Sequence, residues 1–452
     1  MEYFGTAGIR GPIETKVTPD LALKVGKALG TYVNGNGKSR VVVGMDARTS
    51  GDMIKSSLKS GLMYSGVDVR DVDITTTPAL AFLTYRMGDS GVMITASHNP
   101  PTDNGIKIFN SNGKEYFLHQ EKKLEEIIKK QDFERANWDK VGSKKRIEAG
   151  DLYQAHVNRY VEHETDKKIL LDCASGPGSL ITPYVLRDMG CEVVSINSHL
   201  DGHFPGRKPE PRPENIKHMT PVVQDIDADL GIAHDGDADR IAVVDENGEV
   251  VTEDTLIALL GGYYVEENEG GTVLTTINTS FRIDEYVKER GGRVERHELG
   301  KLHEKLQKPD VVFAAEPWKF IHPEFGPWID SAVSSGILLK LLDLKDKTMS
   351  ELKDEVSDLP IRKENILCKD CDKEKIVRKA TTELRKEFKN QIKDEITVSG
   401  IRLNLEDGSW ILLRPSGTEP KIRLFVEGRD KKRLETLFEN SYSIVKETME
   451  AK

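Results

Sequence analysis

The sequence predicts an α/β protein of four domains, in which three related α/β domains are followed by one α+β domain. The first reason is length, because a chain of 452 residues exceeds what one hydrophobic core usually supports. The second is an alternation of helical patterns with short β-branched runs up to about residue 345, which is typical of α/β layers. The third is a C-terminal group of short strands followed by a long helix.

The first domain is predicted over residues 1–148. A helical pattern covers 21–33, and β-branched strands follow at 41–44 and 91–94. The segment 120–146 is highly charged and has few apolar positions, which predicts a surface helix and then a polar connection. The first boundary is therefore placed near residue 148.

The second domain is predicted over residues 149–246. A strand at 168–172, a helix at 182–189 and a strand at 191–194 form a strand–helix–strand unit. Residues 201–213 are crowded with Pro and Gly and predict a loop, because Pro lacks the N–H that a strand ladder needs. Loops of this length are often functional.

The third domain is predicted over residues 247–358 and the fourth over 359–452. A hairpin at 241–251, turned at Asn247-Gly248, leads into the third domain. The chain is polar and charged between the third domain and residue 396. The remaining predicted elements are helices at 254–266, 283–289 and 432–446, and strands at 272–276, 311–313, 401–405, 410–413 and 422–426.

Composition and charge exclude several classes of function. The 75 acidic and 65 basic residues give a net charge of -10, which offers no attraction to nucleic acid. No apolar run approaches the ~18 residues of a membrane-spanning helix, and the N-terminus lacks a signal-peptide pattern. The four cysteines are too few for a disulfide framework. We therefore expect a cytoplasmic protein with neither nucleic acid nor a membrane as partner.

A serine is presented on a rigid turn at residues 95–101, directly after an apolar strand. Ser97 can carry a phosphoryl group, and His98 and Asn99 can donate hydrogen bonds to its oxygens. Lys107 can neutralise charge there or move a proton. The alternative for this motif alone is a loop with a capping serine.

Three carboxylates lie within five residues between two apolar strands. Asp235, Asp237 and Asp239 repel one another unless a cation lies among them. Small residues between them permit a tight turn that aims all three at one ion, and oxygen ligands favour magnesium over zinc. Arg240 follows directly. The alternative is a solvated acidic turn.

Two further loops are candidates for binding. Residues 414–420 combine a guanidinium, two hydroxyls and a glycine, which suits a phosphate group, although a plain turn uses similar residues. In residues 314–319, Glu316 can accept hydrogen bonds from sugar hydroxyls and Trp318 can stack on a ring face. A buried Trp in a bend is the alternative there.

Taken in order, these loops closely resemble those of the α-D-phosphohexomutase family, which contains phosphoglucomutases, phosphomannomutases and phosphoglucosamine mutases. The resemblance covers essentially the whole chain and begins at the Phe-Gly-Thr-Ala-Gly-Ile-Arg-Gly segment 4–11. It implies four domains around a central cleft. It also implies that Ser97 is a phosphoserine with His98 and Lys107 beside it, and that Arg10 lies near the active-site phosphate.

The resemblance further implies the cofactor, the chemistry and the remaining contacts. Mg²⁺ is held by Asp235, Asp237, Asp239 and the serine phosphate, with Arg240 adjoining. The enzyme interconverts the 1-phosphate and 6-phosphate of a hexose or hexosamine through a sugar bisphosphate, which also serves as activator. The distal phosphate contacts are Arg414, Ser416, Gly417, Thr418 and Arg423.

The sugar loop departs from the family pattern. The family usually has Gly-Glu-x-Ser-Gly, whereas this chain keeps the acid as Glu316 and has Trp318 and Lys319 in place of serine and glycine. The resemblance implies that the sugar contacts are Glu316, Trp318, Lys319 and Lys301. Lys301 also replaces a residue that is commonly acidic or an imidazole, which brings one more cation to the sugar or its phosphate.

Because of this departure, a phosphopentomutase on the same scaffold is an alternative to the hexose enzyme. A metal-dependent sugar phosphatase and a non-catalytic sugar-phosphate sensor are the others, and the sequence leaves the oligomeric state open.

Overall fold

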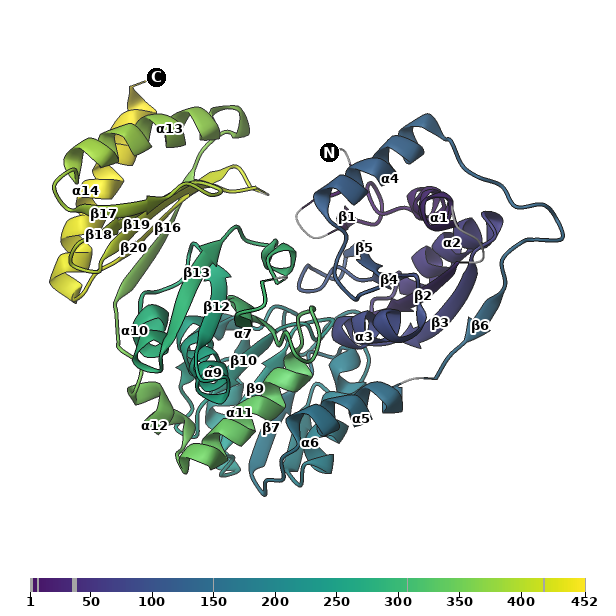
Figure 1. Cartoon of the computed structure of the whole chain (residues 1–452), viewed down its shortest axis with the longest axis horizontal. Coiled ribbons are helices and arrows are strands. Elements are labelled where there is room, and N and C mark those ends of the chain that lie inside the picture. The colour runs from purple at the N-terminus through teal and green to yellow at the C-terminus, as the bar shows by residue number, and fades with distance from the viewer. Residues whose placement is uncertain are drawn as a thin grey trace. The chain divides into compact units, whose positions relative to one another are not determined.

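The computed structural model describes residues 3–5, 8–34, 39–148, 150–306, 308–417 and 419–451. The chain divides into two compact units. Figure 1 labels their helices and strands. Unit 1 comprises Met1–Glu253 and Trp318–Lys353, and unit 2 comprises Asp254–Pro317 and Asp354–Lys452. The chain therefore passes between the units three times.

The first sheet of unit 1 is mixed, with the strand order β1-β5-β4-β2-β3-β6. Strands β4, β2, β3 and β6 are parallel, while β5 is antiparallel to both β4 and β1. Its strands are β1 (Ile9–Pro12), β2 (Arg40–Met45), β3 (Asp68–Ile74), β4 (Ser90–Ile94), β5 (Asp103–Asn110) and β6 (Lys144–Arg146), and its helices are α1 (Pro19–Val33), α2 (Gly51–Tyr64), α3 (Thr77–Met87) and α4 (Leu118–Lys130).

Local sequence explains where these helices begin and which faces they bury. Thr18 and Thr76 cap α1 and α3, each accepting a hydrogen bond from a backbone N–H three residues on, and Pro follows at the start of both helices. The core under α1, α2 and α4 includes Val25, Leu58 and Leu124, which are fully buried. The charged helix α4 thus still contributes apolar residues to this core.

The second sheet of unit 1 has the order β11-β10-β9-β7-β8. Strands β7, β8 and β9 are parallel, and β10 returns antiparallel to β9. The predicted hairpin is confirmed, because β10 pairs with β11 across a turn in which Gly248 has φ +77°. The elements are β7 (Lys168–Asp172), β8 (Glu192–Ile196), β9 (Leu230–His234), β10 (Ile241–Val244), β11 (Val250–Val251), α5 (Gly150–Val161), α6 (Thr182–Asp188), α7 (Pro213–Ile216) and α8 (Met219–Asp225).

The stretch that returns to unit 1 late in the chain adds a short strand and a long helix. Strand β15 (Lys319–Ile321) begins at one of the predicted sugar-loop residues. Helix α11 (Ser331–Lys345) packs on α5 and α6 and is almost entirely buried along its first three turns. Asp330 caps α11 by accepting a hydrogen bond from the backbone N–H of Val333. Helix α12 (Met349–Asp354) follows at the last boundary between the units.

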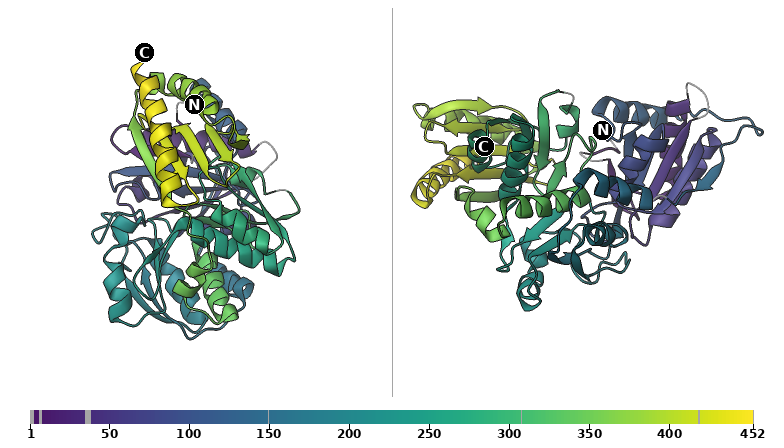
Figure 2. Two further views of the ribbon diagram at one scale, coloured as in Figure 1. Left: turned by 90° about the vertical axis from the view of Figure 1, so that its left-hand side faces the viewer. Right: turned by 60° about the horizontal axis from the view of Figure 1, so that its bottom comes forward.

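Unit 2 contains a parallel sheet and an antiparallel sheet. In the first, β12 lies between β13 and β14, and in the second the order is β16-β20-β19-β18-β17. Helices α13 and α14 cover one face of the antiparallel sheet (Figure 1, Figure 2). The elements are α9 (Glu253–Glu267), β12 (Gly271–Thr276), α10 (Arg282–Glu289), β13 (Gly292–His297), β14 (Val311–Glu316), β16 (Ile361–Leu367), α13 (Asp370–Glu387), β17 (Ile392–Ile396), β18 (Ile401–Leu405), β19 (Trp410–Pro415), β20 (Lys421–Glu427) and α14 (Lys431–Glu450).

A second apolar cluster joins the two sheets of unit 2. Ile277 packs with Trp410 and Phe425, and all three are buried. The buried Arg402 guanidinium stacks over Trp410 and donates hydrogen bonds to the carbonyls of Ile277 (2.7 Å) and Thr279 (2.6 Å). Because an unpaired buried charge is costly, these contacts hold the two sheets together as one body.

The segment that the sequence analysis described only as polar contains β16 and α13. Helix α13 buries Ile376, Val377, Ala380 and Leu384 on one face. These positions recur at helical spacing, but charged residues surround them so densely that the apolar face is weak in the sequence. In the described part of the chain, no helix combines the length and apolar character needed to cross a membrane.

Candidate functional site

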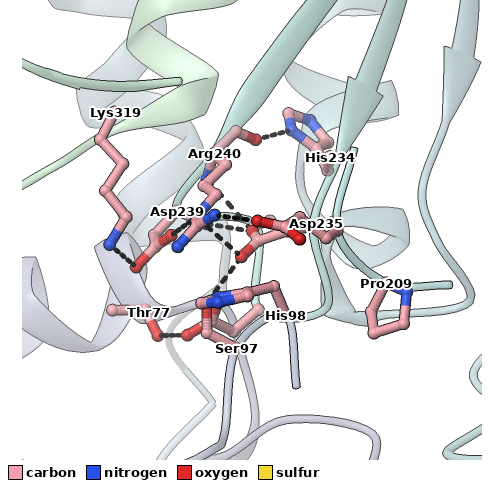
Figure 3. Close-up of polar contacts among 12 residues, drawn as sticks. Thr77, Ser97, His98, Pro209, His234, Asp235, Asp239, Arg240 and Lys319 are labelled. Atoms are coloured by element: carbon pink, nitrogen blue, oxygen red, sulfur yellow. Dashed lines mark hydrogen bonds and ion pairs between the residues drawn. The ribbon is translucent and has the colours of Figure 1, made fainter. Parts of the chain in front are cut away.

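Ser97 lies at the carboxyl end of β4 in a strained turn. Its φ is +52°, in the left-handed region that non-glycine residues rarely adopt. Its backbone N–H donates to Thr95 Oγ1 at 2.8 Å, and its side chain is buried. The hydroxyl Oγ donates to Asp235 Oδ2 at 2.7 Å and lies 3.3 Å from His98 Nδ1 (Figure 3). The predicted carrier thus lies directly against the predicted metal loop.

Arg48, which the sequence analysis did not identify, holds the serine turn in place. Its buried guanidinium forms an ion pair with the buried carboxylate of Asp46, and Asp46 also accepts from Thr95 at 2.6 Å. The guanidinium donates to Asp46 Oδ2 (3.0 Å) and to the carbonyls of Ser97 (2.9 Å), Asn99 (2.7 Å), Pro100 (2.5 Å) and Asp103 (2.8 Å). The turn is therefore held through its own carbonyl groups.

The predicted metal loop, residues 235–240, connects the antiparallel strands β9 and β10 and folds around Asp235. Asp235 Oδ1 accepts from the backbone N–H groups of Asp239 and Arg240, both at 3.1 Å. A Cβ at Gly236 would lie 2.5 Å from the Ser97 carbonyl oxygen, so only glycine permits this approach. Ala238 takes a φ of +55° to complete the turn.

The three carboxylates converge on one point. Asp235, Asp237 and Asp239 are buried, and one oxygen of each lies within 4.8 Å of the others. Lys107 donates to Asp237 at 3.1 Å and to Asp239 at 3.0 Å, and Thr77 donates to Asp237 at 2.6 Å. Oδ1 of Asp237 and Oδ1 of Asp239 are buried and have no hydrogen-bond partner in the described chain. Buried carboxylate oxygens without hydrogen-bond partners suit a hard divalent cation.

Their surroundings give these acids different charge states. Burial, together with the charges of Asp237 and Asp239, raises the pKa of Asp235 to about 8. Burial also opposes ionisation of Asp239, but the cations of Lys107, Lys319 and Arg240 outweigh it and hold the pKa of Asp239 well below its usual range. The cluster thus holds one carboxyl that is protonated at neutral pH.

Cations surround the serine and its histidine neighbour. Burial, then the charges of Arg240, Arg10 and Lys319, lowers the pKa of His98 far below its usual value, so its imidazole is neutral. Arg10 lies on β1, and its Nε and Nη2 are buried without a hydrogen-bond partner among the described residues. Unsatisfied buried donors of this kind are explained by an anionic ligand.

The loop at residues 201–213, predicted to be functional because of its length, contacts both of these loops. Glu210 accepts from Arg240 Nη1 at 3.1 Å. The Phe204 ring lies under the Arg48 guanidinium at 5.1 Å. Arg207 donates to the buried Asp172 carboxylate at 2.8 Å and to the carbonyl of His234, the residue before Asp235, at 2.5 Å. The loop therefore braces the serine turn and the metal loop.

Two residues of the predicted sugar loop lie in unit 1 beside the carboxylates. Trp318 is only 9% exposed, and its carbonyl accepts from the N–H of Ile241 at 3.1 Å. Lys319 Nζ lies 3.5 Å from Asp239 Oδ2 (Figure 3). The ammonium of Lys319 is therefore directed at the metal loop.

The remaining predicted sugar contacts belong to unit 2. Glu316 Oε1 accepts from the backbone N–H of Gly300 at 2.5 Å. Lys301 forms an ion pair with Glu298 at 2.9 Å. One carboxylate oxygen of Glu316 is thus already engaged within its own unit.

The predicted distal phosphate loop joins β19 to β20 in unit 2. Arg414 and Arg423 face each other across these strands. Burial and the neighbouring charge of Arg423 lower the pKa of Arg414, which shows two guanidinium groups held close together. Nε of both arginines and Oγ of Ser416 are buried without hydrogen-bond partners within the described ranges. A Cβ at Gly417 would meet nothing within 4 Å, and Thr418 lies outside the described residues.

Lys373 on α13 is a second residue that the sequence analysis missed. It is buried, and its Nζ donates to the carbonyls of Ser416 (2.5 Å) and Glu419 (3.0 Å). Its role resembles that of Arg48, because a buried cation holds a loop through carbonyl oxygens.

The structure thus gathers two groups of predicted site residues. Those in unit 1 are Ser97, His98, Lys107, Arg10, Arg240, Lys319 and the three aspartates, and those in unit 2 are Arg414, Ser416, Gly417 and Arg423.

Family models match nearly the whole chain. They describe phosphoglucomutase/phosphomannomutase alpha/beta/alpha domains I, II and III and the C-terminal domain. The matched residues are 1–135, 151–248, 252–359 and 364–442, respectively.

Similar proteins match over their full length. A phosphopentomutase of Thermococcus kodakarensis is 52% identical, with 98% of each chain covered. Probable phosphoglucosamine mutases of Methanopyrus kandleri and of Thermococcus kodakarensis are 41% and 38% identical, with 99% of each chain covered in both cases.

Solved structures share the fold. A phosphoglucomutase/phosphomannomutase family protein from Burkholderia thailandensis has a TM-score of 0.89 at 24% identity, covering 98% of this chain and 97% of its own. An Aspergillus fumigatus N-acetylphosphoglucosamine mutase, solved with GlcNAc-6P and magnesium, has a TM-score of 0.63 at 15% identity, covering 99% and 96%. Because four consecutive family models and full-length relatives agree, the chain belongs to the phosphoglucomutase/phosphomannomutase family and is a phosphosugar mutase, an intramolecular phosphotransferase of the isomerase class.

Proposed function

We propose that this phosphosugar mutase uses Ser97 as its phosphoryl carrier and acts on a pentose, interconverting the 1-phosphate and the 5-phosphate. The observation that supports the carrier is the hydroxyl of Ser97, held 2.7 Å from Asp235 at the meeting point of the serine turn and the metal loop. A strained φ of +52° presents this hydroxyl, and backbone strain of this kind is typical of functional residues.

In the proposed cycle, a hydroxyl oxygen of the sugar monophosphate attacks the phosphorus of phosphorylated Ser97. The new O–P bond forms while the bond to Ser97 Oγ breaks, and Oγ keeps that electron pair. Oγ also takes up one proton, which balances the proton lost from the sugar hydroxyl. With Asp235 assigned to the metal, His98, whose Nδ1 lies 3.3 Å from Oγ, is the group placed to relay this proton. The sugar bisphosphate then returns its other phosphoryl group to Oγ by the same exchange, so we expect a bisphosphate to activate the enzyme.

Asp235, Asp237 and Asp239 would hold Mg²⁺ together with an oxygen of the serine phosphate. The two unpartnered carboxylate oxygens in the cluster support this assignment. When bound, the ion supplies charge stabilisation to the phosphoryl oxygens. Lys107 remains paired to Asp237 and Asp239 and keeps these two carboxylates ionised, while Arg240 lies 3.8 Å from Asp235 and orients it.

The distal phosphate, the one that is not reacting, is assigned to Arg414, Ser416, Gly417, Thr418 and Arg423. Two facing guanidinium groups with unpartnered Nε atoms suit a dianionic group, because paired arginines bind phosphate oxygens through several charge-assisted hydrogen bonds. Glu316 and Lys301 are assigned to the sugar itself.

The pentose assignment rests on a contrast between two proteins of one organism. The chain is 52% identical to the Thermococcus kodakarensis phosphopentomutase and 38% identical to the probable phosphoglucosamine mutase of that organism. The sugar loop supports the same assignment, because Trp318 adds bulk where the family usually has serine, and a pentose requires less room than a hexose. An N-acetylated sugar would require more.

A substrate panel tests this proposal. The 1-phosphates of ribose, glucosamine, mannose and glucose are each supplied with Mg²⁺ and the matching bisphosphate, and phosphate transfer is followed by phosphorus NMR. We expect ribose 1-phosphate to give the highest kcat/KM, and transfer to stop in Ser97→Ala. Release of free phosphate would identify a phosphatase, and binding without turnover would identify a sensor.

A hexosamine mutase is the second candidate. Its support is the set of full-length relatives described as probable phosphoglucosamine mutases at 37–41% identity. A higher kcat/KM for glucosamine 1-phosphate than for ribose 1-phosphate would favour this candidate and contradict the pentose assignment.

A further inference from the structure

Lys319 is anchored beside the three carboxylates by the strand next to it. It is the first residue of β15, and the carbonyl of the preceding Trp318 accepts a hydrogen bond from Ile241, the first residue of β10. Trp318 has φ +66°, in the left-handed region, and its ring is buried. A bulky residue is held in this conformation only where its surroundings compensate. The packing therefore fixes the direction from which Lys319 enters the site.

The Lys319 side chain is mostly buried, and its ammonium has spare donors. Its side chain is 12% exposed. Within the described part of the chain, its one hydrogen-bond partner is Asp239 Oδ2, at 3.5 Å, which is long for an N–H···O hydrogen bond. An ammonium carries three donors, and burying a charge is costly unless those donors are satisfied. Further oxygen acceptors close to Nζ are therefore needed to satisfy the remaining donors of Lys319.

The carboxylates do not require Lys319 as a counter-ion. Lys107 already lies 3.0 Å from the same oxygen of Asp239 and 3.1 Å from Asp237. Lys319 instead belongs with a group of cations around the carrier. Arg240 Nε lies 3.9 Å from Asp239 and 3.8 Å from Asp235, and Asp235 accepts the hydrogen bond from Ser97 Oγ at 2.7 Å. Arg10 likewise has buried donors without partners among the described residues. An anion among these cations would satisfy both.

We propose that Lys319 is a catalytic residue that binds the phosphoryl group as it moves between Ser97 and the sugar, and not a contact to a sugar hydroxyl. Nζ donates to phosphoryl oxygens while the O–P bond to the sugar forms and the bond to Ser97 Oγ breaks. Oγ retains the electron pair and gains the proton that balances the one lost by the sugar hydroxyl. Lys319 supplies charge only and transfers no proton. The proposal rests on the mutase chemistry and on Ser97 as carrier, and it is independent of the pentose assignment.

Lys319→Met and Lys319→Arg test this role in the full-length enzyme. Steady-state kcat and KM are measured for ribose 1-phosphate and glucosamine 1-phosphate at several Mg²⁺ concentrations, and quench-flow follows the phosphoserine. We expect Lys319→Met to lower kcat roughly 100-fold for every sugar that the wild type turns over, because one charged donor to the transferring group is lost. KM should change less than about threefold, since ground-state sugar binding is retained. Lys319→Arg should retain more activity than Lys319→Met.

Lys24→Met is the matched control, because Lys24 is an exposed lysine of the same unit, on α1. It should leave kcat unchanged. A rise in KM alone, or a loss confined to one sugar, would overturn the proposal in favour of a sugar contact. Recovery of kcat at high Mg²⁺ would overturn it in favour of a role in metal binding.

If Lys319→Met does not fold, Lys319→Gln and Lys319→Arg carry the test, and full kcat in Lys319→Gln would overturn the proposal. Whichever sugar the wild type prefers, the comparison is made on that sugar, so failure of the pentose assignment is separate from failure of this one.

Discussion

At the scale of single residues, the site depends on how each buried charge is paired. Asp239 is held ionised by the ammonium of Lys107 at 3.0 Å, whereas Asp235 is held with its pKa raised to about 8. The two acids differ by only four positions in the chain. Their difference arises from contacts that the fold creates, because Lys107 lies on β5, far away in sequence.

The raised pKa of Asp235 predicts proton release when Mg²⁺ binds. Below pH 8 the metal-free carboxyl is mostly protonated, so the ion must displace that proton. The apparent affinity should therefore rise with pH up to about 8 and then level off. At pH 7 we expect about one proton to be released per ion bound. Calorimetry in two buffers of different ionisation enthalpy measures this number, and a value near zero would contradict the raised pKa.

Arg48→Lys should loosen the serine turn. A lysine has three donors on one atom and cannot reproduce the five hydrogen bonds that the guanidinium forms. We expect the free energy of unfolding to fall by about 2 kcal/mol and kcat to fall roughly 10- to 100-fold, since small displacements of a reacting group are costly. Urea denaturation and steady-state kinetics measure both effects. Arg40→Lys, at an exposed arginine of the same unit, is the control and should change neither.

The sequence predicted the residues that carry the reactive groups better than the residues that hold those groups in position. Ser97 and the three aspartates stand in short motifs whose residue types already indicate their chemistry. Arg48 and Lys373 act through backbone carbonyls of distant loops, and such contacts leave no pattern in a single sequence. Lys319 was predicted as a sugar contact from its place in the loop, whereas its Nζ is directed at Asp239. Its role therefore remains a prediction, for which the kinetic test above is designed.

At the scale of elements, the strands and helices with clear apolar periodicity were predicted and the site-forming loops were placed between them. Helix α14 and strands β18, β19 and β20 lie where alternation and helical spacing indicated. Helix α13 was missed because its buried residues are diluted by charge. The three predicted domain boundaries remain predictions, and the compact units group residues 318–353 with the first part of the chain.

Gly236→Ala tests how closely the metal loop must approach the serine turn. The added Cβ would lie 2.5 Å from the Ser97 carbonyl oxygen, so one of the two loops must move. We expect a loss of roughly 100-fold in kcat and a destabilisation of about 1–3 kcal/mol. Gly150→Ala is the matched control, because its nearest neighbour would be 3.8 Å away, at the start of α5. Wild-type kcat in Gly236→Ala would show that the loops tolerate separation.

At the scale of the whole molecule, the groups assigned to catalysis divide between the two compact units. Unit 1 holds Ser97, the three aspartates and Lys319, and unit 2 holds the arginines of the distal phosphate loop. The sugar loop itself is divided, because Glu316 belongs to unit 2 and Lys319 to unit 1. Each unit is stabilised by its own core and buried charges, as Arg402 illustrates in unit 2. Binding of the distal phosphate should therefore be separable from the chemistry at Ser97.

Arg423→Met tests this separation. The substitution removes one of two facing guanidinium groups and keeps the apolar part of the side chain against the sheet. A charge-assisted hydrogen bond contributes about 1.5–3 kcal/mol, so KM for the sugar phosphate should rise roughly 10- to 100-fold. Mg²⁺ affinity, measured by calorimetry, should be unchanged, because every proposed metal ligand lies in unit 1. The rate at which water hydrolyses phosphorylated Ser97 should also be unchanged. A change in Mg²⁺ affinity would contradict this division, since it would require the distal loop to act on the metal loop even when no sugar is bound.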